Sequence, residues 1–259
     1  MPGFGRKGLR QDLAARPIRP ILRGIMPGRL LLISTSTVHG TGYLEHALPE
    51  LRALLQDVRR VLFIPFALRD HDAYAAKAGQ AFGRIGCAVD SLHEAVDMRA
   101  ALESAQAVFC GGGNTFRLLR SLYEREALPL IRRRVADGMP YAGASAGANL
   151  ACPTIKTTND MPILEPPSFE ALGLVSFQIN PHYLDPDPGS THMGETRETR
   201  IREFHEENQA PVLGLREGAM LLVEEGHIWL KGLAGARIFR RGQEPAEARP
   251  VARLDELVG

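Results

Sequence analysis

The sequence predicts an α/β fold with a mostly parallel sheet flanked by helices and a small C-terminal β region. Between residues 29 and 143, short apolar runs rich in branched residues alternate with longer segments whose apolar residues recur three and four positions apart. This alternation is typical of repeated βα units, whose parallel strands share one sheet. From residue 211 to 240, short β-like runs separated by glycines replace that pattern. These runs predict the smaller β region.

Each expected element follows from its local pattern. Strands are expected at 29–34, 61–66, 88–92, 107–110 and 140–143, and helices between them at 43–58, 72–85, 97–104 and 115–137. A strongly charged segment, 195–207, is expected to form a further helix. Apolar runs at 220–223 and 227–230 flank Gly226 and predict a β-hairpin that turns at this glycine.

Charge is distributed unevenly along the chain. The 259 residues carry a net charge of +1, but residues 1–28 hold six basic residues and one aspartate, a net of +5, which leaves −4 for the rest. We expect a basic N-terminal extension at 1–28, flexible or packed against a partner, and a single α/β domain at 29–259. The mildly acidic body argues against nucleic acid as a partner. The ordinary composition, 44% hydrophobic and 24% charged, argues against a membrane protein.

The cysteines and histidines favour a cofactor-free protein in a reducing compartment. Cys87, Cys110 and Cys152 are odd in number and lack the C-x-x-C spacing of disulfide frameworks and zinc sites. We therefore expect a cytoplasmic location. The sequence contains no H-E-x-x-H motif and no run of His and Cys at ligand spacing, so we expect no metal and no other cofactor.

The candidate nucleophile is Ser145, in the segment GASAG at 143–147. This segment follows a buried strand and opens a helix, which is the context of a nucleophile elbow. Small residues are needed around the serine because the turn brings helix and strand close together. The N–H of Ala146 could then stabilise an oxyanion, and the triple glycine at 111–113 could supply a second donor, for which we choose Gly113.

A serine nucleophile needs a general base, and a base needs a carboxylate to orient it. Among eight histidines, His182 fits best because it follows the apolar run 172–179, where a strand would end and loops over a sheet edge would begin. Two carboxylates compete to be its partner, Asp160 in a polar loop and Glu217 at another strand end. The choice between them depends on geometry.

Four segments, taken in order, carry a family resemblance. They are GGGNTF at 111–116, SAGANLACPTI at 145–155, TTNDMPI at 157–163 and QINPH at 178–182. Together they closely resemble the peptidase E family of α-aspartyl dipeptidases, serine peptidase family S51, and the likeness extends from about residue 30 to about residue 239. The resemblance implies a fold like that of a class I glutamine amidotransferase domain, and it leaves a homodimer possible.

The resemblance also implies a reaction. A member of this family would hydrolyse dipeptides, and at most slightly longer peptides, that begin with aspartate, through an acyl-enzyme on Ser145 with His182 as base. Either Glu217 or Asp160 is implied as the third member of the triad. We favour Glu217 for the hydrogen bond to His182 and expect Asp160 near the substrate amine.

Substrate-binding residues follow from the same motifs. The segment 194–198 resembles the family's aspartate-recognition segment, so Arg197 is expected to bind the substrate carboxylate through its planar guanidinium. Its alternative role is a member of an exposed ladder of ion pairs along a helix. Asn114 and Asn159 are also expected to bind substrate.

Three other functions remain open at this point. A cyanophycinase-like relative would cleave β-aspartyl linkages. A classical α/β-hydrolase esterase would share Ser145 but place its base near the C-terminus, whereas 77 residues follow His182. A non-catalytic, amidotransferase-like interaction domain would retain the elbow as a packing turn only.

Overall fold

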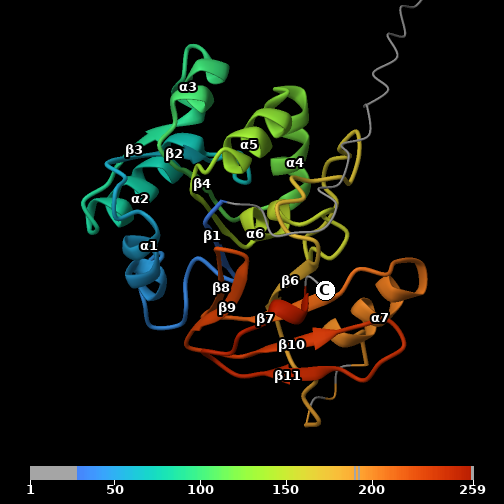
Figure 1. Ribbon diagram of the computed structural model, residues 1–259. Coiled ribbons are helices and arrows are strands. Elements are labelled where there is room, and N and C mark those ends of the chain that lie inside the picture. The colour runs from blue at the N-terminus through green and yellow to red at the C-terminus, as the bar shows by residue number, and fades with distance from the viewer. Residues whose placement is uncertain (1–27, 190, 192, 258–259) are drawn as a thin grey trace, which may run out of the picture.

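The computed structural model describes residues 28–189, 191 and 193–257 (Figure 1). The basic extension expected at 1–28 therefore lies outside the described residues, except for Gly28. This glycine is buried, and a Cβ added to it would lie 2.7 Å from the carbonyl oxygen of Val135. The first strand begins two residues after Gly28, at Leu30.

A seven-stranded sheet forms the centre of the larger part of the molecule (Figure 1). Its strand order is β3-β2-β4-β5-β1-β8-β9, with bounds β1 (Leu30–Ile33), β2 (Arg60–Ile64), β3 (Ala88–Ser91), β4 (Val108–Cys110), β5 (Tyr141–Ala144), β8 (Ala219–Glu224) and β9 (His227–Gly232). Strands β1 to β5 pair in parallel, and β8 and β9 are antiparallel. The predicted α/β class and the five predicted N-terminal strands are confirmed.

Helices cover both faces of this sheet. Leu30 and Leu32 of β1 pack into one core, and Leu31 and Ile33 pack into another on the opposite face. The second core contains residues of η1 (Glu45–Ala47), α1 (Leu48–Leu54) and α2 (His71–Gly83); the first contains residues of η2 (Leu92–Glu94), α3 (Met98–Ser104), α4 (Thr115–Glu124), α5 (Ala127–Ala136) and α6 (Ala146–Ala151). Burial on both faces explains why β1, β4 and β5 are continuously apolar.

Two predicted helices are shorter than expected, and a proline accounts for each. The helix expected at 115–137 is divided into α4 and α5, and Glu126 between them has φ 50°. An uninterrupted helix would need a hydrogen bond from the N–H that Pro129 lacks, whereas this proline is tolerated in the first turn of α5. The helix expected at 43–58 is likewise reduced to η1 and α1, with Pro49 in the first turn of α1.

A second sheet of four strands carries the C-terminal half of the site. Its order is β11-β10-β7-β6, with bounds β6 (Gln178–Tyr183), β7 (Val212–Arg216), β10 (Ala236–Phe239) and β11 (Ala246–Ala248). One face packs against the main core through Ile179 and Leu213. The other face packs against α7 (Arg197–Glu207), whose Ile201 contacts Val212. The 3₁₀ helix η3 (Asp255–Leu257) follows this sheet.

The predicted hairpin is present, but it lies in the other sheet. Strands β8 and β9 are joined by Glu225 and Gly226, which have φ 50° and 82°, as a two-residue hairpin turn with positive φ requires. Strand β8 pairs with β1, so the hairpin extends the main sheet instead of the smaller β region. Antiparallel strands often extend the edge of an otherwise parallel sheet in this way.

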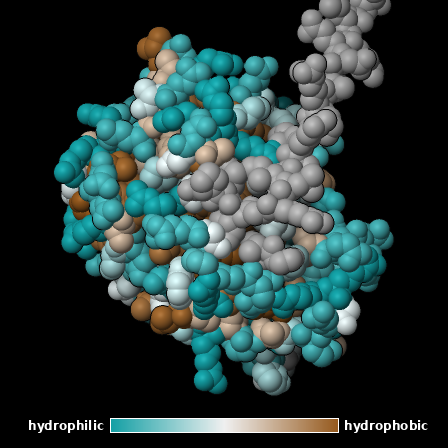
Figure 2. Space-filling view, viewed as in Figure 1, coloured by the Kyte–Doolittle hydropathy of each residue, from teal (hydrophilic) through white to brown (hydrophobic). Residues whose placement is uncertain are grey.

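Hydrophilic residues dominate the face shown in Figure 2, and the hydrophobic ones form small separate patches. The large apolar side chains are instead collected in the two cores described above. None of the helices in the described part of the chain is long and apolar enough to cross a membrane.

Candidate active site

Ser145 lies at the junction between β5 and α6 with φ 52° and ψ −104°. This unfavourable backbone conformation costs about 1–3 kcal/mol, and hydrogen bonds on both sides support it. The Ser145 N–H donates to the carbonyl oxygen of Ile33 at 2.9 Å, and the N–H of Asn149 donates to the Ser145 carbonyl at 3.0 Å. Such a turn presents the hydroxyl at the carboxyl end of the parallel strands.

The glycines around Ser145 are required by close packing. A Cβ at Gly143 would lie 2.5 Å from the backbone of Gly147, and a Cβ at Gly147 would lie 2.2 Å from the carbonyl oxygen of Cys110. No side chain larger than a hydrogen atom fits at either position. The sequence pattern therefore reflects the contact between β4, β5 and α6.

His182 lies within β6, one residue before its end, and not beyond the strand as expected. The expected strand over the apolar run ending at 179 is wrong in its bounds, because β6 begins only at Gln178, where it pairs with β7. The pairing register shifts between Pro181 and Tyr183, and His182 has φ 52°. Such an irregularity redirects a side chain at the end of a strand.

The imidazole of His182 connects Ser145 to Glu217. Its Nε2 lies 2.9 Å from Ser145 Oγ, and its Nδ1 lies 2.8 Å from Glu217 Oε1. A carboxylate only accepts hydrogen bonds, so Nδ1 donates to Glu217 and Nε2 accepts from the serine hydroxyl. The three side chains have the connectivity of a Ser-His-carboxylate triad.

Ser34, which the sequence reasoning missed, fixes the backbone of His182. The buried Ser34 hydroxyl accepts the His182 N–H at 2.9 Å and donates to the carbonyl oxygen of Leu215 at 2.7 Å. It therefore joins the end of β1 to β6 and β7. Its position as the first polar residue after the apolar run of β1 is the signal that could have found it, because parallel strand ends meet at one edge.

The triple glycine lies directly against the nucleophile turn. A Cβ at Gly112 would lie 3.2 Å from the Cβ of Ser145, and Gly113 has φ 133° with a hypothetical Cβ 2.6 Å from the carbonyl oxygen of Ala67. The amide of Gly112 interacts with the hydroxyl of Tyr74, which offsets part of the burial that raises the pKa of this tyrosine to about 12. We therefore retain the Gly113 amide as the proposed oxyanion donor.

The other proposed donor is the N–H of Ala146. This residue begins α6, and the first N–H groups of an α-helix have no intrahelical acceptor. They point along the helix axis, where the dipole favours negative charge. Ala146 directly follows Ser145, and Gly113 directly follows Gly112, which packs against Ser145, so we propose these two amides as the donors of an oxyanion site.

Asp160 is held away from His182 by two threonines. Its Oδ2 accepts from the Thr115 N–H at 2.8 Å and the Thr115 hydroxyl at 2.5 Å, and lies 3.1 Å from the Thr158 hydroxyl. Among the described residues, none hydrogen-bonds to Oδ1. This oxygen can accept a hydrogen bond from a substrate, whereas Glu217 occupies the position beside the imidazole.

Arg197 is the first residue of α7 and is half-buried. Burial lowers its pKa, nearby Arg200 adds to this effect, and the charge of Asp160 opposes it. Its neighbours Arg200 and Arg202 form ion pairs along the helix, at 3.4 Å with Glu195 and 2.8 Å with Glu198. Within the described part of the chain, Arg197 itself has no such ion pair, so it lies outside the ladder considered as its alternative role.

Asn114 and Asn159 both take part in the framework of the site. Asn114 accepts from the Arg117 N–H at 3.0 Å, capping α4, and donates to the carbonyl oxygen of Met161 at 2.8 Å. Asn159 donates to the carbonyl oxygen of Pro181 at 2.6 Å and accepts from Asn180 at 2.9 Å. Each amide retains one N–H for a substrate, because these contacts use only one of its two donors.

Within the part of the chain that the structure describes, one group outside this site has the geometry to hold a metal ion. Single ligand atoms of Asp72, His93 and Glu94 all lie within 4.8 Å of one another, although these residues show no ligand spacing in the sequence. His93 Nε2 already lies 2.8 Å from Asp72 Oδ1, and both carboxylates are exposed. The group is separate from Ser145 and takes no part in the chemistry discussed below.

Known proteins are similar to this chain in sequence and in fold. The sequence model of Peptidase family S51 matches residues 30–231. Peptidase E of Streptomyces coelicolor is 56% identical over 229 residues, covering 88% of this chain and 94% of the relative. A Drosophila melanogaster protein named "Probable alpha-aspartyl dipeptidase" is 51% identical over 232 residues, covering 88% and 97%.

A solved structure extends the comparison to the fold. The crystal structure of a peptidase from an acI-B1 Actinobacterium superposes with a TM-score of 0.65 at 18% identity and covers 90% of this chain and 98% of that one. At this identity the likeness concerns the fold alone. Because the family match spans most of the chain and close relatives cover it almost fully, this protein belongs to peptidase family S51.

Proposed function

We propose that this protein is a serine peptidase that hydrolyses dipeptides, and slightly longer peptides, with an N-terminal aspartate. The observation that carries the proposal is the hydrogen-bonded chain Ser145–His182–Glu217 at a nucleophile elbow. Two relatives are named "Peptidase E" and "Probable alpha-aspartyl dipeptidase". The proposal joins the activity in these names to the chemistry that this arrangement can perform.

The proposed reaction is acyl transfer. His182 takes the proton of the Ser145 hydroxyl as its oxygen attacks the carbonyl carbon of the N-terminal aspartate, and the amides of Ala146 and Gly113 stabilise the oxyanion. The tetrahedral intermediate collapses when His182 gives the proton to the leaving amine. Water, deprotonated by His182, then hydrolyses the ester on Ser145 and releases aspartate.

The opposite charges of Asp160 and Arg197 favour a substrate that carries both signs at one end. Asp160 has a free carboxylate oxygen, and Arg197 has no ion-pair partner among the described residues, yet the two influence each other electrostatically. An N-terminal aspartate has an ammonium group and a carboxylate on adjacent carbons. We propose that Asp160 binds the former and Arg197 the latter.

A dipeptide panel tests the proposal. Asp-Leu, Glu-Leu and Asn-Leu are assayed with the wild type and with Arg197→Ala, and Arg200→Ala is the matched control because Arg200 is exposed on the same helix. The wild type is expected to prefer Asp-Leu, and Arg197→Ala should raise KM for it by about 10- to 100-fold, the worth of a hydrogen bond to a charged group. Equal cleavage of Asp-Leu and Asn-Leu by the wild type would refute the specificity.

The alternatives give different results in the same experiment. A cyanophycinase-like enzyme would cleave β-linked Asp-Leu in preference to the α-linked dipeptide. A non-catalytic domain would cleave neither, and its Ser145 would not react with a fluorophosphonate.

We further propose a cytoplasmic location. Cys87, Cys110 and Cys152 are all buried free thiols, as suits a reducing compartment.

A further inference from the structure

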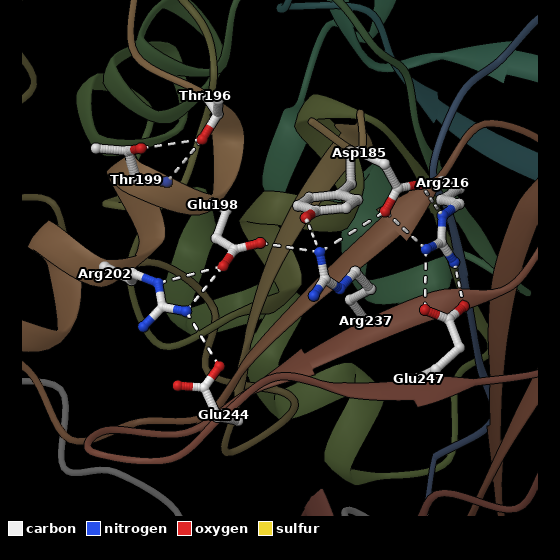
Figure 3. A network of polar contacts seen from close by, with 10 residues as sticks. Asp185, Thr196, Glu198, Thr199, Arg202, Arg216, Arg237, Glu244 and Glu247 are labelled. Carbon is white, nitrogen blue, oxygen red and sulfur yellow. Dashed lines mark hydrogen bonds and ion pairs between the residues drawn. The ribbon is translucent and has the colours of Figure 1, made fainter. Parts of the chain in front are cut away.

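An ion-pair network joins α7, the helix that begins with Arg197, to the second sheet (Figure 3). It runs from α7 through β10 to the segment after β6 and the end of β7. The members that the argument uses are Glu198, Arg237, Asp185 and Arg216, with Arg202 as an outer branch. The figure shows that Arg237 lies between the carboxylates of Glu198 and Asp185.

The first turn of α7 has few other anchors. Later residues of this helix, Ile201 and Phe204, pack against the second sheet, but no residue in the first turn is buried. The connection that leads from β6 is also exposed, at 184–189 and at 193–195. The start of α7, where Arg197 lies, therefore depends on polar contacts for its position.

Glu198 supplies such a contact to a neighbouring strand. Its Oε2 lies 2.8 Å from Nη1 of Arg237 on β10, and the two side chains are 17% and 22% exposed. The other polar contacts of the first turn stay local, because Thr199 bonds Thr196 and Arg200 pairs with Glu195. Among the described residues, Glu198–Arg237 is the ion pair that joins this turn to the sheet.

The remainder of the network reaches the triad. Arg216, which precedes Glu217, binds Asp185 through two hydrogen bonds of 2.7 and 2.9 Å. Arg237 lies 3.9 Å from Asp185 and donates at 3.3 Å to the hydroxyl of Tyr183, the residue after His182. Arg197, His182 and Glu217 thus each have a direct chain neighbour, Glu198, Tyr183 and Arg216 respectively, in one connected polar network.

We propose that the Glu198–Arg237 pair is a positioning element for substrate recognition, holding Arg197 at a fixed place relative to the Ser145–His182–Glu217 triad. The inference rests on the proposed function, in which Arg197 binds the substrate carboxylate. Glu198 and Arg237 touch no reacting atom. They act through the helix start that they fasten to β10.

The test compares three variants of the full chain. Arg237→Ala removes the ion pair with Glu198. Arg237→Lys retains the positive charge but replaces the guanidinium with a single ammonium group. Arg202→Ala is the matched control, since Arg202 also binds Glu198, at 2.8 Å, but from the same helix, and its other partner, Glu244 at 3.5 Å, is 89% exposed. Each variant is assayed on Asp-Leu and Asn-Leu, and hydrogen exchange at the start of α7 is measured by mass spectrometry.

Arg237→Ala should raise KM for Asp-Leu by about 10-fold, because a small displacement of a binding group has large kinetic effects. Its kcat should stay within about 2-fold, and the preference for Asp-Leu over Asn-Leu should fall. Exchange at the start of α7 should be faster by about 10-fold. Arg237→Lys should restore much of each property, and Arg202→Ala should resemble the wild type.

Two results would overturn the positioning role. One is unchanged exchange at the start of α7 in Arg237→Ala. The other is an equal loss of activity on both dipeptides, which would indicate general damage to the site. A wild type inactive on Asp-Leu would refute the proposed function, while the exchange measurement would still decide whether Glu198–Arg237 fastens the helix.

Discussion

Replacing Glu217 with glutamine tests whether this carboxylate, and not Asp160, assists His182. The substitution retains the size and shape of the side chain but removes its charge, so the imidazolium that forms during the reaction loses a partner 2.8 Å away. The two side chains are 36% and 50% exposed, so solvent weakens their interaction. Charges about 4 Å apart are worth about 1 kcal/mol in water and about 4 kcal/mol near a protein surface.

This range sets the expected size of the effect. Glu217→Gln should lower kcat by about 5-fold to 10³-fold with little change in KM. Asp160→Asn should instead raise KM by about 10- to 100-fold, since a hydrogen bond to the substrate ammonium is worth about 1.5–3 kcal/mol. The assay is steady-state hydrolysis of Asp-Leu, with thermal unfolding of each variant as the control for folding.

The opposite pattern would refute this reasoning. If Asp160→Asn reduced kcat and left KM unchanged, while Glu217→Gln retained the kcat of the wild type, Asp160 would be the partner of the base. The hydrogen bonds of Asp160 to Thr115 and Thr158 would then have to be exchanged for one to His182 in the substrate complex.

Three further substitutions test other contacts of the site. Ser34→Ala should lower kcat by about 10-fold, because the backbone of His182 loses a hydrogen bond of about 1 kcal/mol or more; an unchanged kcat would show that this bond is dispensable. Gly112→Ala adds a Cβ 3.2 Å from that of Ser145, so kinetics should show a loss of activity, whereas calorimetry should show a smaller loss of stability. Hydrogen bonds from Arg216 lower the pKa of Asp185, so this carboxylate stabilises the fold above about pH 4 and the effect is lost as pH falls through the lowered pKa. The difference in Tm between wild type and Asp185→Asn should therefore be largest near neutral pH and should approach zero in acid. A difference in Tm that does not change with pH would contradict this prediction.

The local signals in the sequence were sufficient for the βα core. Strands β1, β4 and β5 are apolar runs followed by serine or glycine and are buried on both faces, as at Leu31 and Leu32, whereas the edge strand β3 is largely exposed. Some other predictions were wrong. The helix expected at 115–137 is divided near Pro129, and the hairpin belongs to the main sheet and not to the smaller β region. Sheet membership depends on long-range pairing with β1, which no local pattern encodes.

In the site, too, local patterns could be predicted and long-range contacts could not. Ser145 could be proposed because its strained turn requires a dense local pattern of small residues. The residues alone left the partner of His182 open and only the family resemblance favoured Glu217, since Glu217 is 35 residues away along the chain and reaches His182 through the pairing of β6 with β7. Ser34 and Arg237 were missed for this reason too: their contacts join segments whose proximity exists only in the folded chain.

The central claim, that Ser145 attacks the substrate, is tested most directly by combining hydrolysis with covalent labelling. Wild type and Ser145→Ala are incubated with Asp-Leu, and in parallel with a fluorophosphonate followed by intact-protein and peptide mass spectrometry. We expect the wild type to hydrolyse Asp-Leu and to carry one label on Ser145, and we expect Ser145→Ala to do neither while unfolding at a similar temperature. Hydrolysis of Asp-Leu by Ser145→Ala at the wild-type rate would contradict the account.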